Sequence, residues 1–145
     1  MKLNPECVRD TLIYLEDNLV MCEYFSIKGI SFKTIINDLS QDNKYSEEHV
    51  AYTLTQLMSA GYITGYKNYN GKDRKLSGCV DDISWNGHNF INTVRPETIW
   101  NATKKSAKKM GVASIHGIMS LASTIFNAII NDPEYISAII NNIPK

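Results

Sequence analysis

The sequence lacks most of the features by which enzymes and metal proteins are recognised. It has three cysteines, an odd number, and none stands in a Cys-x-x-Cys pair. The three histidines are far from the cysteines and from one another, so no zinc-binding spacing is present. There is also no phosphate-binding glycine loop, nucleophile elbow or His-Glu-x-x-His sequence. These absences predict a non-catalytic protein with no cofactor and no metal site.

An excess of charge of one sign is also missing. Lys+Arg and Asp+Glu both number 15, so the formal net charge is zero. A typical DNA-binding domain is clearly basic, and the balance therefore counts against DNA binding. Residues 1–95 hold 10 basic and 12 acidic side chains, whereas residues 96–145 hold 5 and 3. The first region is thus slightly acidic.

The beginning of the sequence lacks the apolar core of a signal peptide. Together with the odd cysteine number, this predicts a reducing cytoplasm, bacterial or that of a phage host, with the cysteines as buried or half-buried small hydrophobes. Residues 112–130 contain no charge and approach the length of a membrane span. Polar side chains line one side of this segment, however, as His116, Ser120 and Asn127 illustrate. We therefore expect an amphipathic helix and no integral membrane span.

Periodicity and capping residues predict a mainly α-helical protein with a small β-hairpin (α+β). Apolar side chains at helical spacing indicate a first helix over about residues 5–20, capped by Asn4. A short strand at 27–30 and two helices capped by Ser31 and Ser46 should follow, the second ending at Gly61. A strand from Tyr62 and a partner at about 76–85 then form a hairpin.

The tip of that hairpin is predicted at Asn70-Gly71, because both residues tolerate positive φ. A fourth helix should open at Gly87 and end before Pro96. This order is typical of a winged helix-turn-helix, which we assign to residues 1–95. Residues 96–145 form a helical C-terminal region, with helices expected at 97–110, 112–130 and 133–142.

Three blocks of the sequence resemble a known family. They are MKLNPECVRDTLIYLEDN, YSEEHVAYTLTQLMSAGYI and DISWNGHNFINTVRPETIWNATKKSAKKMG. They are similar to small proteins of Gram-positive bacteria and their phages grouped as domain of unknown function 2513. The resemblance covers almost the whole chain. It implies a bacterial or prophage origin and a cytoplasmic protein, and it provides no catalytic motif to carry over.

Candidate DNA contacts lie on the second helix of the helix-turn-helix and on the wing. In this architecture that helix enters the major groove, where Thr53 and Gln56 could read base edges and Tyr52 could touch a phosphate. Glu47 and Glu48 at its start would repel the backbone, or simply stabilise the helix through its dipole. The wing carries four cations interleaved with tyrosines, a pattern suited to phosphate contact or to an ordinary solvated hairpin: Lys67, Lys72, Arg74 and Lys75.

The C-terminal region offers an apolar face and a cationic face. The apolar face of residues 112–130 predicts a homo-oligomer, with Ile118, Ile125 and Phe126 near the contact. Lys104, Lys105, Lys108 and Lys109 share one side of the preceding helix, where they either bind an anionic partner or stabilise the helix C-terminus.

Two functions follow from these patterns. The first is a non-catalytic, phage- or prophage-encoded DNA-binding or regulatory factor. The alternative is a protein-interaction module, such as an inhibitor or adaptor that binds a host protein, for example a defence protein, without contacting DNA.

Overall fold

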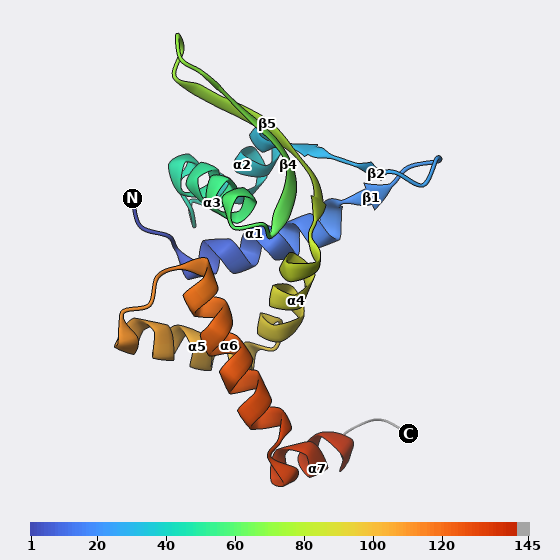
Figure 1. Cartoon of the computed structure of the whole chain (residues 1–145), viewed down its shortest axis with the longest axis vertical. Helices are drawn as coiled ribbons and strands as arrows, with labels where there is room; N and C mark the ends of the chain where they lie inside the picture. The colour runs from blue at the N-terminus through green and yellow to red at the C-terminus, as the bar shows by residue number, and fades with distance from the viewer. Residues whose placement is uncertain (142–145) are drawn as a thin grey trace. The chain divides into compact units, whose positions relative to one another are not determined.

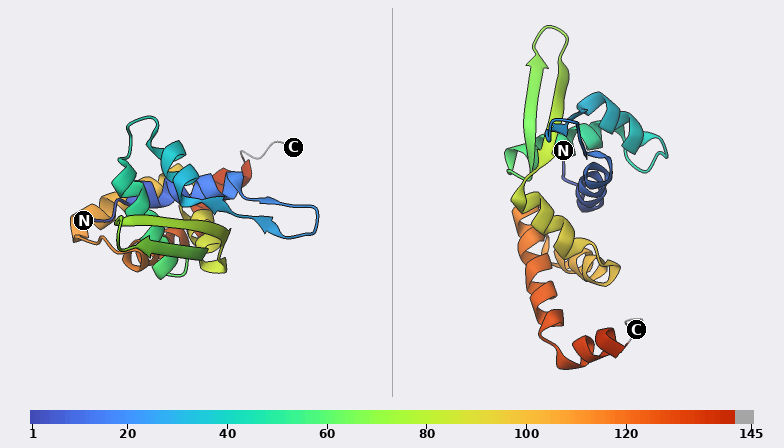
Figure 2. Two further views of the ribbon diagram at one scale, coloured as in Figure 1. Left: turned by 90° about the horizontal axis from the view of Figure 1, so that it is seen from above. Right: turned by 90° about the vertical axis from the view of Figure 1, so that its right-hand side faces the viewer.

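The computed structural model describes residues 1–141 and is mostly helical with small antiparallel sheets (Figures 1 and 2). The predicted α+β class is therefore confirmed. The chain divides into two compact units, Met1–Asn92 and Thr93–Lys145. The boundary lies three residues before the one that we predicted.

Capping side chains define where the first helices of unit 1 begin. The helices are α1 (Pro5–Asn18), α2 (Phe32–Ser40) and α3 (Glu47–Ser59). The side chains of Asn4, Ser31 and Ser46 accept hydrogen bonds from backbone N–H groups in the first turn of each helix, as the sequence predicts. Gly61 follows α3 with a φ of 81°, which is the left-handed conformation expected of a residue that ends a helix.

A three-stranded antiparallel sheet, with strand order β3-β5-β4, lies against these helices. Its strands are β3 (Ile30–Ser31), β4 (Ile63–Asn70) and β5 (Lys75–Ile83). The β4–β5 register shifts between Thr64 and Gly65, which marks a β-bulge. Gly65 has a φ of 151°, and a Cβ there would lie 2.0 Å from the carbonyl oxygen of Cys79. Glycine is required at this bulge.

The tip of the β4–β5 hairpin differs from the prediction. Residues 71–74 form the turn, and its positive φ belongs to Arg74 (51°), not to Gly71. The Asn70 side chain holds the turn instead. Its oxygen accepts from the Lys72 N–H at 3.0 Å and its amide donates to Asp73 at 3.2 Å. Asn70 thus acts through an Asx turn rather than through an unusual backbone conformation.

A second hairpin, which was not predicted, follows α1. β1 (Val20–Met21) pairs with β2 (Ile27–Lys28), and Gly29 separates β2 from β3. The predicted strand at 27–30 is therefore two strands in two sheets. In Figure 1 the β1–β2 hairpin and the β4–β5 hairpin project from unit 1 in different directions.

The core of unit 1 forms where the apolar faces of its helices meet the sheet. Helix α4 (Trp85–Val94) begins two residues before the predicted Gly87, because the Ser84 hydroxyl accepts from the Gly87 N–H. The rings of Tyr62 and Phe90 meet edge to face. The fully buried side chains include Val8, Leu12, Leu15, Phe32, Ile35, Val50, Leu54, Leu57, Val80 and Phe90.

Unit 2 consists of α5 (Glu97–Met110), α6 (Ile115–Ile130) and α7 (Pro133–Asn141). Gly111 ends α5 with a φ of 71°, as predicted. Helix α6 begins three residues later than expected, because Ser114 caps it by accepting from the Gly117 N–H. The predicted end of the last helix at residue 142 lies outside the described residues. Within residues 1–141, no helix is both long and apolar enough to cross a membrane.

Candidate nucleic-acid interface

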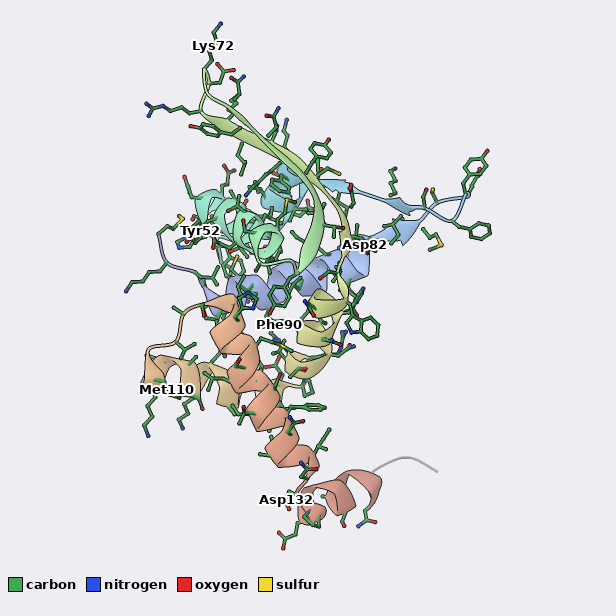
Figure 3. The ribbon with its side chains drawn as sticks, in the orientation of Figure 1. Tyr52, Lys72, Asp82, Phe90, Met110 and Asp132 are labelled. Carbon is green, nitrogen blue, oxygen red and sulfur yellow. The ribbon has the colours of Figure 1, made fainter. Side chains whose placement is uncertain are left out.

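The β4–β5 hairpin carries the four predicted cations on a projecting ribbon. From Thr64 to Arg74 every residue is exposed, and Figure 3 shows Lys72 at the end of the hairpin, directed away from the body of the unit. Asp73 is the one carboxylate in the turn. Tyr66 and Tyr69 are each more than half exposed. The hairpin thus presents cations and aromatic rings without burying them.

The strand register divides these cations between the two faces of the hairpin. Lys67 pairs with Gly78 and Asn70 pairs with Lys75. Since side chains alternate along a strand, Lys67 and Lys75 point to opposite faces. The Lys67 ammonium donates to the Ser59 hydroxyl at 3.4 Å, so its face is the one turned toward α3. Lys72 and Arg74 lie in the turn and are exposed.

Helix α3 presents fewer accessible candidate DNA contacts than we predicted. Thr53 is only 1% exposed, and its hydroxyl donates to the carbonyl of His49 at 2.8 Å. The prediction that Thr53 reads a base edge is therefore wrong, because the residue belongs to the buried face of α3. Tyr52 and Gln56 are half-buried and keep an accessible side, whereas Glu47 and Glu48 are exposed at the start of the helix.

A groove of about 860 Å³ lies between α2, the first residue of α3 and the beginning of β5; we call it the α2–β5 groove. Ile36 and Leu76 are its half-buried apolar residues, and Lys33 and Lys75 supply positive charge. Glu47 also lines it. Sequence reasoning missed Lys33, although the Ser31 cap and the buried Phe32 and Ile35 place it on the outer face of α2.

The other end of α2 is acidic. Asp10, Asp17, Asp38 and Asp42 line a pocket of about 370 Å³ between α1 and the end of α2, where the one lining cation, Lys44, pairs with Asp10. Tyr14 donates to Asp38 at 2.5 Å, and burial together with this carboxylate raises the pKa of Tyr14 to about 12. Basic side chains therefore lie near one end of α2 and mostly acidic side chains near the other. The formal net charge of zero conceals two surfaces of opposite sign.

The β1–β2 hairpin presents apolar side chains to solvent. Tyr24 is 87% and Phe25 86% exposed, and Val20 and Met21 are also exposed. Phe25 has a φ of 60°, which is uncommon for a bulky residue. Cys22 lies beside Ser26 (Sγ to Oγ 2.8 Å), and this hydrogen bond lowers the pKa of the thiol. The prediction that all three cysteines are at least half-buried is wrong for Cys22.

In unit 2 the predicted interface residues divide into two kinds. Ile118 is 1% exposed, so its predicted place at an oligomer contact is wrong, because the chain already covers it. Ile125 and Phe126 are half-buried and retain accessible apolar surface. Lys105, Lys108 and Lys109 are exposed on α5, while the Lys104 ammonium lies 5.8 Å from the centre of the Trp100 ring.

Comparison with known proteins places the chain in a family. The family model described as "Hypothetical protein (DUF2513)" matches residues 2–113. The chain belongs to this family. A relative from Haemophilus influenzae, described as "Uncharacterized protein", is 29% identical over 86 residues, which is 57% of this chain and 70% of the relative. No solved structure matches. An origin in Gram-positive bacteria or their phages stays a prediction.

The DUF2513 match covers unit 1 and α5 and ends before α6. It includes the β4–β5 hairpin, the α2–β5 groove and the β1–β2 hairpin, but not Ile125 or Phe126. The family region also includes Asp81, Asp82 and His88. Within the described part of the chain, no three His, Cys, Asp or Glu side chains come together to hold a metal.

Proposed function

We propose that unit 1 of this DUF2513 protein is a winged helix-turn-helix that binds double-stranded DNA, and that the chain is a non-catalytic regulatory factor of phage or prophage origin. The observation that carries the proposal is the exposed β4–β5 hairpin with its four cations, projecting beside a pair of capped helices. The strand order β3-β5-β4 supports it, because it joins this hairpin to the strand that precedes α2.

Affinity in this proposal comes mainly from the hairpin. Lysine and arginine side chains that neutralise phosphates supply most of the electrostatic binding energy, whatever the sequence. Helix α3 offers Tyr52 and Gln56 for base or sugar contacts, but Glu47 and Glu48 oppose the approach of its first turn to phosphate. The hairpin therefore sets the strength of binding, and α3 adjusts it.

The test removes the four cations together. Substituting Lys67, Lys72, Arg74 and Lys75 by alanine should lower affinity for a short DNA duplex and flatten its salt dependence, since each lost phosphate contact reduces the slope by about one. Fluorescence anisotropy over a series of salt concentrations gives both quantities. A matched control removes the four α5 lysines, Lys104, Lys105, Lys108 and Lys109, which leaves the hairpin intact.

Wild-type protein that fails to bind duplex DNA at low salt would refute the proposal. An unchanged slope in the hairpin variant, with a reduced slope in the α5 control, would move the interface to unit 2. Thermal unfolding of both variants checks that the substitutions leave the fold intact. The hairpin residues are exposed, so little loss of stability is expected.

A second candidate function has its own supporting observation. The exposed Tyr24 and Phe25 on the β1–β2 hairpin resemble the aromatic anchors that dominate protein interfaces. In this alternative the protein is an inhibitor or adaptor that inserts the hairpin into an apolar pocket of a host protein. A partner captured from a bacterial host and then purified should bind the wild type and lose the Tyr24→Ser/Phe25→Ser variant. Equal binding of both proteins would reject this hairpin as the contact.

A further inference from the structure

We infer that the α2–β5 groove seats one sugar-phosphate strand of the DNA duplex, with Lys33 and Lys75 as its cationic contacts. This inference rests on the proposed function and adds a binding element, α2, to the hairpin and α3. It also assigns a role to Lys33, which the sequence pattern alone left unused.

The groove lies next to the cations of the hairpin turn. It runs along the outer side of α2, where Ser31, Lys33, Thr34 and Asn37 are exposed, and reaches the beginning of β5 at Lys75 and Ser77. Lys75 directly follows the turn that carries Lys72 and Arg74. A strand that meets the hairpin tip can therefore continue into the groove without leaving a line of cations.

The lining of the groove combines polar groups with apolar surface. Exposed hydroxyl and amide groups, here from Thr34, Asn37 and Ser77, are frequent partners of phosphate oxygens. The half-buried Ile36 and Leu76 provide apolar surface against which a deoxyribose can lie. The volume of about 860 Å³ lies within the range of roughly 300–1,000 Å³ found for ligand pockets.

One negative charge in the groove lining, that of Glu47, opposes phosphate binding. Glu47 lines the groove and is exposed, so a phosphate seated there lies near a carboxylate and is repelled by it. Neutralising Glu47 should then strengthen DNA binding more than neutralising Glu48 does. Glu48 is also exposed at the start of α3 but does not line the groove, so the difference between the two variants reports a strand in the groove rather than one that only approaches the first turn of α3.

The experiment compares four variants of the full chain with a short DNA duplex across a salt series. Lys33→Ala should lower affinity several-fold and reduce the salt slope by about one. Glu47→Gln should raise affinity more than Glu48→Gln does, while Lys28→Ala should leave it close to wild type. Lys28 is an exposed lysine on β2 that lies outside the groove. Circular dichroism melts confirm that each variant is folded.

Two results would overturn the inference. If Lys33→Ala and Glu47→Gln behave like their controls while the four-cation hairpin variant still loses affinity, DNA binding stands and the groove is not its seat. If the wild type does not bind duplex DNA at low salt, the proposed function fails and the groove assignment fails with it. Tighter binding of a duplex RNA than of DNA would also overturn it, since the strand committed to here is DNA.

Discussion

Tyr45 anchors the connection between α2 and α3 on helix α1. Its side chain is 6% exposed, and its hydroxyl donates to the Asp10 carboxylate at 2.6 Å. The Lys44 ammonium lies 2.7 Å from the same carboxylate. A hydrogen bond to a charged group contributes about 1.5–3 kcal/mol. Tyr45→Phe should therefore lower the free energy of unfolding by about 1.5 kcal/mol in urea titrations at neutral pH. Tyr24→Phe, whose hydroxyl is exposed, should leave it unchanged.

The same residue gives this stability a pH dependence. Burial and the Asp10 carboxylate raise the pKa of Tyr45, so the folded chain keeps its proton after the unfolded chain has lost it. The contribution is fully present below the unfolded pKa of about 10 and falls as the pH rises above it. Tyr14, with its pKa raised to about 12, acts in the same direction. Equal alkaline loss of stability in wild type and Tyr45→Phe would contradict this account.

Thr53 shows what residue-level prediction from the sequence missed. Val50, Thr53, Leu54 and Leu57 follow the spacing of a single buried stripe, and all four are buried. We assigned Thr53 to the exposed face of α3 because it is polar. Its spacing from Val50, Leu54 and Leu57 would have predicted a buried position. Its hydroxyl is satisfied within the helix by the His49 carbonyl, which makes its burial inexpensive.

The bulge in β4 is the feature of the hairpin most sensitive to a single substitution. A Cβ on Gly65 would collide with the Cys79 carbonyl, and its φ of 151° is unfavourable for other residues. Gly65→Ala should therefore cost about 1–3 kcal/mol of stability from the backbone conformation, and more from the clash. Gly71→Ala is the matched control, because nothing lies within 4 Å of its added Cβ. Chemical denaturation measures both, and equal values would show that the bulge relaxes freely.

Elements with strong local signals were predicted well. Helices α1, α2 and α3 begin at the residues that their caps indicated, because capping is decided within one turn. The β1–β2 hairpin was missed because its strands have two residues each and its turn lacks an Asn-Gly or Asp-Gly pair. The groove could not be predicted either, since it depends on how α2 and β5 lie against each other, and the sequence alone does not fix that packing.

Association of the whole chain is predicted from α6. Ile125 and Phe126 keep accessible apolar surface, and burying such side chains contributes about 1.5–3 kcal/mol each. We expect a homodimer or higher oligomer at micromolar concentration in sedimentation experiments. Phe126→Glu should dissociate it, whereas Asn127→Glu, at an exposed position of the same helix, should not. A wild-type monomer of 16.4 kDa would contradict the prediction.

Charge across the whole molecule explains why net neutrality is a weak argument against DNA binding. The 15 basic and 15 acidic side chains balance. In unit 1, however, cations gather at the β4–β5 hairpin and at Lys33, while Asp10, Asp17, Asp38 and Asp42 outnumber the single Lys44 at the other end of α2. Local potential, rather than total charge, steers a polyanion to a surface. The acidic end should orient the protein by repelling the duplex.

The most direct measurement of the central claim is an NMR titration of the ¹⁵N-labelled full chain with a short DNA duplex. Binding through the proposed surface predicts amide shift changes that grow with added DNA at residues 71–78 of the β4–β5 hairpin, at residues 33–37 of α2 and at the start of α3. Residues 20–28 of the β1–β2 hairpin should not move. No shift changes at low salt, or changes confined to residues 20–28, would contradict the account.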